Sequence, residues 1–237
     1  MERSYSQSPT IGPAAQPLRW LAWGLCALSL TMLAGGFALA LAGGGCFYTQ
    51  FYVVAVAASA LVGGLVAARR PENPVGWLFL GSAFCYGLFA LTTEYAARSA
   101  PPRLALLTSW LSGILVSFGA GLPLGILPHY FPTGRLLGPR WRPLAYGGMA
   151  VLAIFTLYHA VRPGPLQRTP ELDNPFGLAL LRPLVPVLDA LSMLLLLAAL
   201  IAGGVALTVR YRRSRGVERQ QLVPRRRPRA VGLAARH

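Results

Sequence analysis

The chain of 237 residues carries little charge and contains no lysine. Only 12% of its residues are charged, about half the usual share of a soluble domain, whereas 54% are hydrophobic. All 22 basic residues are arginine, and 7 acidic residues leave a formal net charge of +15. With a mean hydropathy of +0.51, this shortage of charge argues against a soluble protein and predicts an integral membrane protein.

Cysteine and histidine are also scarce. The three cysteines have no paired spacing, which excludes a disulfide scaffold and a cysteine-only zinc site; they are Cys26, Cys46 and Cys85. The three histidines lie too far apart in sequence for a local metal site; they are His129, His159 and His237. Because no nucleotide-binding glycine loop and no nucleophile motif is present either, we expect no enzyme activity, no cofactor and no metal.

Apolar residues are gathered into six stretches, each long enough to cross a bilayer core of about 30 Å as a helix. These stretches lie at about 20–42, 51–68, 75–93, 104–127, 144–161 and 184–209. The alternation typical of membrane β-strands is absent. The sequence therefore predicts an all-α bundle of about six transmembrane helices over 19–209, after a disordered segment at 1–18. A cleaved signal ending near Ala40 is the alternative interpretation of the first stretch.

The distribution of arginine predicts the orientation. Ten arginines and one glutamate lie in the basic tail at 210–237. With both termini in the cytoplasm, most arginines fall on that side, as expected for a multi-pass protein of the inner (plasma) membrane. A basic tail on an apolar body favours the lipid bilayer over nucleic acid as the partner. The predicted anchors at headgroup depth are Arg69, Arg70, Trp77, Arg135, Arg140, Trp141 and Arg142.

The fourth apolar stretch contains several glycine and proline residues near one end. Gly119, Gly121, Pro123 and Pro128 predict a kink near its cytoplasmic end. Small residues four apart, as in the pair Gly121 and Gly125, also predict close packing between helices. The kink is open to two interpretations, a ligand site or packing alone.

Two segments look like capped helix starts, 72–76 (Glu-Asn-Pro-Val-Gly) and 173–177 (Asp-Asn-Pro-Phe-Gly). Asparagine can cap a helix, and proline suits the first helical position. We therefore expect a helix to begin at each, on opposite sides of the membrane. A loop at 131–135 has turn residues and precedes the anchors at 140–142, which makes it a membrane-surface loop.

These segments, with 210–222, together resemble the membrane sensor region of multi-pass bacterial two-component sensor histidine kinases. The matching positions are Asn73, Pro74, Gly76, Trp77, Pro132, Gly134, Arg135, Asn174, Pro175 and Gly177. The resemblance covers about residues 20–222 and implies the sensory half of a signal-transduction protein. It also implies a second copy or an intact sensor kinase as partner. The phospho-acceptor and ATP-binding domains of that family have no counterpart in this sequence.

The arginine- and proline-rich residues after about Leu222 depart from that family. We expect them to result from a truncated or frameshifted reading frame. The alternative is a basic tail that contacts anionic lipid.

Three ionisable residues are predicted near the outer membrane face: Glu94, His159 and Asp189. Ionisable groups in membrane spans are costly and often mark a functional site. Our hypothesis is a site that senses pH or binds a small ligand. The alternative is that each side chain simply reaches headgroup water. A small transporter or permease subunit and a structural membrane protein remain as other functional classes.

Overall fold

The computed structural model describes residues 15–43, 48–98, 101–131, 133–136, 138–166 and 169–221. Within these ranges the chain is helical apart from its connecting loops and one isolated β-bridge between Pro165 and Asp173. The predicted all-α class is confirmed, and six helical segments are long and apolar enough to cross a membrane. Most of the expected disordered segment, the family position Pro132 and the tail after Gln221 lie outside the described residues.

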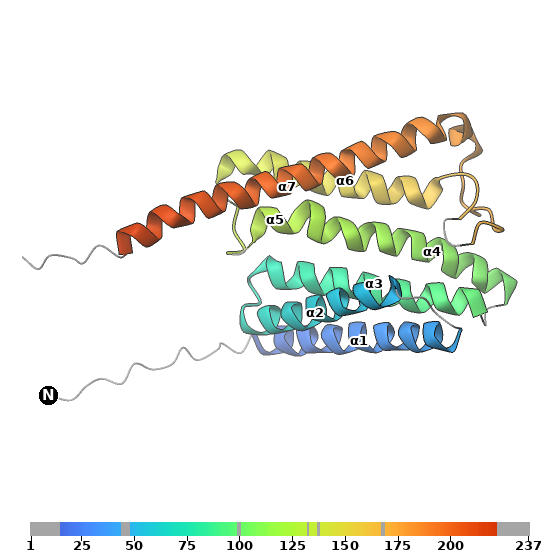
Figure 1. The fold of residues 1–237 in the computed structure, drawn as a ribbon, viewed down its shortest axis with the longest axis horizontal. Coiled ribbons are helices and arrows are strands. Elements are labelled where there is room, and N and C mark those ends of the chain that lie inside the picture. Colours follow the sequence, from blue (N-terminus) through green and yellow to red (C-terminus); the bar gives the residue numbers. More distant parts are fainter. Residues whose placement is uncertain are drawn as a thin grey trace, which may run out of the picture.

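The elements follow one another along the chain, and the connection between α6 and η3 is the longest (Figure 1). The α-helices are α1 (Ala15–Ala42), α2 (Tyr48–Arg69), α3 (Pro74–Arg98), α4 (Pro102–Gly121), α5 (Leu127–Tyr130), α6 (Arg142–Val161) and α7 (Val185–Gln221). A π-helical turn, η1 (Leu122–Ile126), joins α4 to α5, and 3-10 turns precede α6 and α7 as η2 (Pro139–Trp141) and η3 (Ala179–Leu184). Several helices extend beyond the apolar stretches, and α7 runs far into the expected basic tail.

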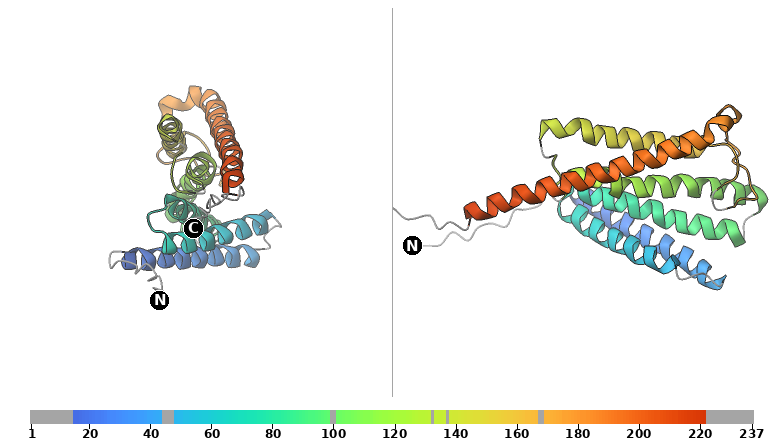
Figure 2. Two further views of the ribbon diagram at one scale, coloured as in Figure 1. Left: turned by 90° about the vertical axis from the view of Figure 1, so that its left-hand side faces the viewer. Right: turned by 45° about the horizontal axis from the view of Figure 1, so that its top comes forward.

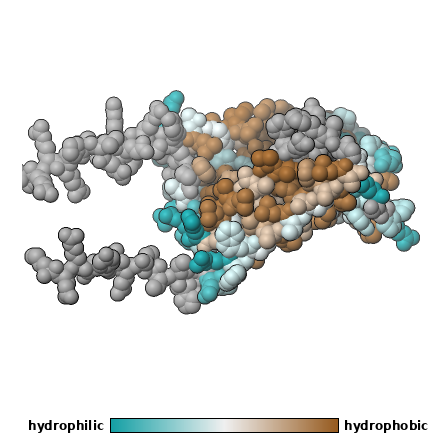
Figure 3. Space-filling view, turned by 60° about the horizontal axis from the view of Figure 1, so that its bottom comes forward, coloured by the Kyte–Doolittle hydropathy of each residue, from teal (hydrophilic) through white to brown (hydrophobic). Residues whose placement is uncertain are grey.

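The two ends of the bundle differ in the parts of the chain that lie there. We call the end where α1 begins and α7 ends the terminal end, and the opposite end the distal end (Figures 1 and 2). Helices α1, α3 and α6 end at the distal end, and α2, α4 and α7 begin there (Figure 1). A space-filling view shows an apolar band between hydrophilic residues at the two ends (Figure 3). This is the surface pattern of a protein whose middle lies in lipid.

Helices α1, α2 and α3 pack closely because small residues let their backbones approach. A Cβ added at Gly63 of α2 would lie 2.8 Å from the backbone nitrogen of Leu80 in α3. One added at Gly87 of α3 would lie 2.7 Å from the carbonyl oxygen of Ser29 in α1. Between α3 and α4, the buried Ser82 hydroxyl donates a hydrogen bond of 2.8 Å to the Gly119 carbonyl. Such close contacts hold helices together where no hydrophobic force acts between them.

The fourth span is interrupted near the terminal end, as the glycines and prolines predict. The Leu127 N–H bonds the Leu122 carbonyl, five residues back, which makes η1 wider than an α-helical turn. Pro128 has no N–H for the Leu124 carbonyl four residues before it. Gly203 of α7 fills this region, since an added Cβ would lie 2.9 Å from Pro128 Cγ. The contact between Gly203 and Pro128 is therefore a packing contact.

Candidate functional site

The distal end of α6 is covered by a loop that is described at residues 162–166 and 169–178. The side chain of Asn174 donates hydrogen bonds of 3.1 and 2.8 Å to the carbonyls of Ala160 and Arg162. The Ala160 carbonyl also accepts a bond of 2.8 Å from Trp110 Nε1 of α4. These donors satisfy carbonyls that the end of a helix leaves without a helical partner.

This loop corrects one sequence prediction. Asn174 accepts a 2.9 Å bond from the Phe176 N–H, the same local geometry as the 3.0 Å bond from Val75 to Asn73. At Asn73 a helix follows directly, because Pro74 is the first residue of α3. After Asn174 the chain forms a turn, and α7 begins only at Val185. The Asn174 amide is committed to the end of α6, so this motif ends one helix and does not start another.

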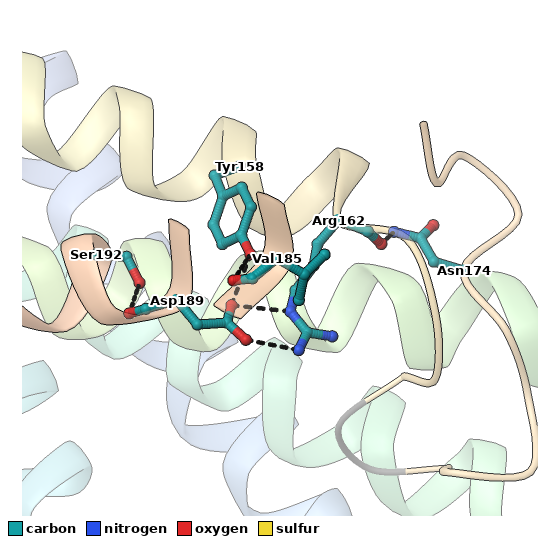
Figure 4. A network of polar contacts seen from close by, with 6 residues as sticks. All are labelled: Tyr158, Arg162, Asn174, Val185, Asp189 and Ser192. Atoms are coloured by element: carbon teal, nitrogen blue, oxygen red, sulfur yellow. Dashed lines mark hydrogen bonds and ion pairs between the residues drawn. The ribbon is translucent and has the colours of Figure 1, made fainter. Parts of the chain in front are cut away.

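A polar network joins α6 to the first turns of α7 (Figure 4). Arg162 donates to both carboxylate oxygens of Asp189, from Nε at 3.0 Å and from Nη2 at 2.7 Å. The Tyr158 hydroxyl donates to Asp189 Oδ1 at 2.6 Å. The two hydrogen bonds to Asp189 raise the pKa of the Arg162 guanidinium above its ordinary value. The bidentate pair therefore stays charged and fixes the distal ends of the two helices in register.

The depth of Asp189 explains why it has two partners. The segment from Asp189 to Val209, the last residue of the candidate span, is about 30 Å long as a helix, which matches the bilayer core. A span of this length that ends at Val209 would place Asp189 at the boundary between lipid and water, where an unpaired carboxylate is costly. Tyr158 and Arg162 are four residues apart and share one face of the end of α6, so both reach the same carboxylate.

His159 lies beside this network. The centre of its ring lies 4.5 Å from the centre of the Phe155 ring, in an edge-on arrangement, and 5.5 Å from the centre of the Tyr158 ring. Within the part of the chain that the structure describes, the imidazole makes no hydrogen bond. It lines two cavities together with Arg162, one between α4, α6 and the distal loop and one between α6 and α7.

The two cavities differ in size and lining. The one on the α4 side has about 30 Å³, and Ser109, Ser112 and Asn174 contribute to its wall. Ser109 is 4% exposed, and its hydroxyl has no hydrogen-bond partner among the described residues. The cavity between α6 and α7 has about 220 Å³, and its wall includes Phe155, Met193 and Leu196. The smaller space suits one or two water molecules.

Glu94 does not join this site. It forms an ion pair with Arg98, four residues later on the same helix α3. Helix α3 packs against α1, α2 and α4, whereas His159 and Asp189 belong to α6 and α7. Of the three ionisable residues in the sequence hypothesis, the structure thus brings two together and leaves Glu94 apart. No group of three or more His, Cys, Asp or Glu residues is placed to hold a metal ion within the described ranges.

The predicted anchors lie at the terminal end. All five arginines among them are exposed, and Trp77 and Trp141 are half-buried. Two of the family segments meet here, because a Cβ added at Gly134 would collide with the side-chain oxygen of Asn73. Gly134 has a φ of 75°, which glycine adopts without strain. Trp77 Nε1 donates a 2.9 Å bond to the Pro71 carbonyl and closes the turn before α3.

Sequence reasoning missed Tyr158 and Arg162. A usable signal was present, since an aspartate in an apolar helix needs a cationic or hydrogen-bonding partner at the same depth. Arg162 directly follows the preceding span and meets that requirement.

The chain matches no protein-family model, no curated protein and no solved structure. The resemblance to sensor histidine kinases therefore remains a prediction from the sequence motifs.

Proposed function

We propose that this chain is the sensory input half of a two-component-type signalling protein, with a non-catalytic role in the inner (plasma) membrane. The order of the four sequence segments between residues 20 and 222 supports the class. The exposed arginines at the terminal end favour the cytoplasm for that end, and the network around Asp189 then faces outward. A second copy of the chain or an intact sensor kinase is the proposed partner.

One observation carries this proposal: α7 joins the distal network to the terminal end as one continuous helix. It begins at Val185, one turn before Asp189, and continues to Gln221. Its 37 residues are about 55 Å long at 1.5 Å per residue. A displacement or rotation of the helix at Asp189 is therefore passed along a stiff rod. A receptor needs such a connection between an outer site and a cytoplasmic output.

The test is a chimera in which a dimeric histidine-kinase core follows Gln221, built in several helical registers and reconstituted in vesicles. Asp189→Asn is expected to change autophosphorylation about threefold or more, because it weakens the attachment of α7 to α6. Glu94→Gln, which removes an ion pair away from α7, is the matched control and should leave the rate unchanged. Equal rates for wild type and Asp189→Asn in every register, with folded protein, would contradict the proposal.

A small transporter is the second candidate, favoured by the interruption of the fourth span at η1. Transporters often use interrupted helices to bind solutes near the middle of the membrane. Pro123→Ala and Pro128→Ala together should regularise this span. A solute flux in vesicles that depends on these two prolines would support transport over signalling.

A further inference from the structure

The cavity between α6 and α7 has a polar end and an apolar body. Its polar wall consists of His159, Arg162, Asp189 and Ser192, and its apolar wall includes Phe155, Met193 and Leu196. At about 220 Å³ it has room for roughly seven water volumes, or for a small ring compound. A space with one polar end and an apolar remainder suits an amphiphile better than a sugar or an ion.

The polar end offers hydrogen-bond donors that have no partner among the described residues. Both carboxylate oxygens of Asp189 are occupied by Arg162, and one of them also by Tyr158. By contrast, Nη1 of Arg162 makes no hydrogen bond to any described residue, and the His159 imidazole makes none either. A ligand with an acceptor oxygen can therefore take a hydrogen bond from Arg162, and the neutral imidazole can donate one through its N–H. The second imidazole nitrogen and the Ser192 hydroxyl, which donates to the Asp189 carbonyl, are the acceptors in this wall.

The charge of the polar end favours an uncharged ligand. Arg162 and Asp189 form a bidentate ion pair, so their charges cancel locally. An anion would compete with Asp189 for the guanidinium, and a cation would be repelled by it. A neutral ketone, ester or alcohol oxygen can accept a hydrogen bond without disturbing the pair.

The cavity opens toward lipid. Met193 lines the cavity and is 67% exposed, and the neighbouring Leu194 is 62% exposed. Both lie in the apolar span, farther from the distal end than Asp189. A compound dissolved in the membrane can therefore enter sideways between α6 and α7 and place its oxygen at the level of Arg162.

We propose that this cavity binds a small uncharged amphiphile, with an acceptor oxygen at Arg162 and His159 and an apolar body against Phe155, Met193 and Leu196. This deepens the sensory role and rests on it, because such a ligand would separate or tighten the distal attachment of α7. The binding site itself can be tested without any signalling readout.

The experiment is ¹⁹F NMR on the full chain in phosphatidylcholine nanodiscs, with empty nanodiscs to correct for partition into lipid. The probe is 4-fluoroacetophenone, an uncharged aryl ketone. Its matched controls are 4-fluoroethylbenzene, which lacks the acceptor oxygen, and 4-fluorobenzoate, which is an anion. We expect saturable binding of the ketone and binding about tenfold weaker for each control.

Two variants on the same helix locate the site. Met193→Trp fills the cavity and should weaken ketone binding about tenfold, whereas Leu194→Trp, which lies on the same exposed face but does not line the cavity, should leave it unchanged. The proposal is overturned by ketone signals equal to those of empty nanodiscs, by equal losses in both variants, by binding of the hydrocarbon as tight as that of the ketone, or by tighter binding of the anion.

The outcomes separate this inference from the sensory role. If the ketone binds as expected and Asp189→Asn does not change the activity of the kinase chimera, the cavity is a ligand site and the sensory role is rejected. If Asp189→Asn changes the activity of the chimera and the ketone shows no saturable binding, the sensory role is supported and this ligand class is rejected.

Discussion

The two halves of the bundle are held together in different ways. In the most apolar part of α3, 56% of the residues are buried inside the protein, whereas none are in the corresponding part of α7. Helices α1–α4 contact one another through glycine and small side chains along much of their length. Helix α7 is attached mainly near two places, Asp189 at the distal end and Gly203 near the interruption of the fourth span.

This difference shows how a membrane bundle can combine a rigid part with a movable one. Lipid is as apolar as leucine, so an apolar helix gains little from burial against another helix. Close backbone approach fixes α1–α4, while the middle of α7 exposes leucine side chains, among them Leu194, Leu197 and Leu200. A change at either attachment of α7 should therefore move α7 before it disturbs the rest.

The largest effect is expected from a side chain introduced into the rigid half. Gly63→Val places carbon atoms against the backbone of α3 and should lower the free energy of unfolding by about 3 kcal/mol. Gly204→Val is the matched control, because no atom lies within 4 Å of an added Cβ there. Unfolding by SDS in mixed micelles, followed by circular dichroism, measures both. Equal destabilisation by the two variants would show that the halves do not differ in packing.

The distal ion pair should come next in size. Asp189→Asn leaves the Arg162 guanidinium without its counter-charge at the membrane boundary and should destabilise the α6–α7 attachment by about 2 kcal/mol. Glu94→Gln removes a pair within a single helix and should cost less than about 0.5 kcal/mol. Hydrogen exchange at residues 185–192 reports the local loss. Protection there that is unchanged in Asp189→Asn would contradict this assignment of the attachment.

The two asparagine motifs provide a finer test, since Asn73 and Asn174 use different atoms. Asn73 contributes its side-chain oxygen to Val75, whereas Asn174 also donates through its amide to the end of α6. Asn174→Asp keeps the oxygen and loses both donors, so we expect a loss of about 1.5 kcal/mol. Asn73→Asp should cost less than about 0.5 kcal/mol, because an aspartate caps equally well. Thermal unfolding compares them, and a larger loss at Asn73 would reverse the assignment.

Much of the fold was predictable because bilayer thickness sets the length of an apolar helix. The six spans and the interruption by Pro123 and Pro128 follow from composition and local chemistry alone. The predicted helix start at Asp173 was wrong because the Asn174 amide donates a hydrogen bond to the end of α6. This contact joins two separate segments, so a local sequence pattern does not predict it.

The candidate site was predictable only in part, for a related reason. Depth in the membrane can be read from the sequence, and it placed Glu94, His159 and Asp189 at one level. Which helices are neighbours cannot be read in the same way, because these helices are apolar on all sides and no face is marked. Glu94 therefore lies apart on α3, and Arg162 was missed as the partner of Asp189.

The smallest effect concerns two buried serines, one in the rigid half and one at the distal cavity. Ser82 donates to the Gly119 carbonyl, so Ser82→Ala should cost about 1 kcal/mol in the free energy of unfolding. The hydroxyl of Ser109 has no partner among the described residues, so Ser109→Ala should be neutral or slightly stabilising in a dry cavity. SDS unfolding of both variants measures the difference. A loss at Ser109 as large as that at Ser82 would mean that a bound water or ligand occupies the smaller cavity beside His159, which would extend the distal site to the α4 side of the bundle.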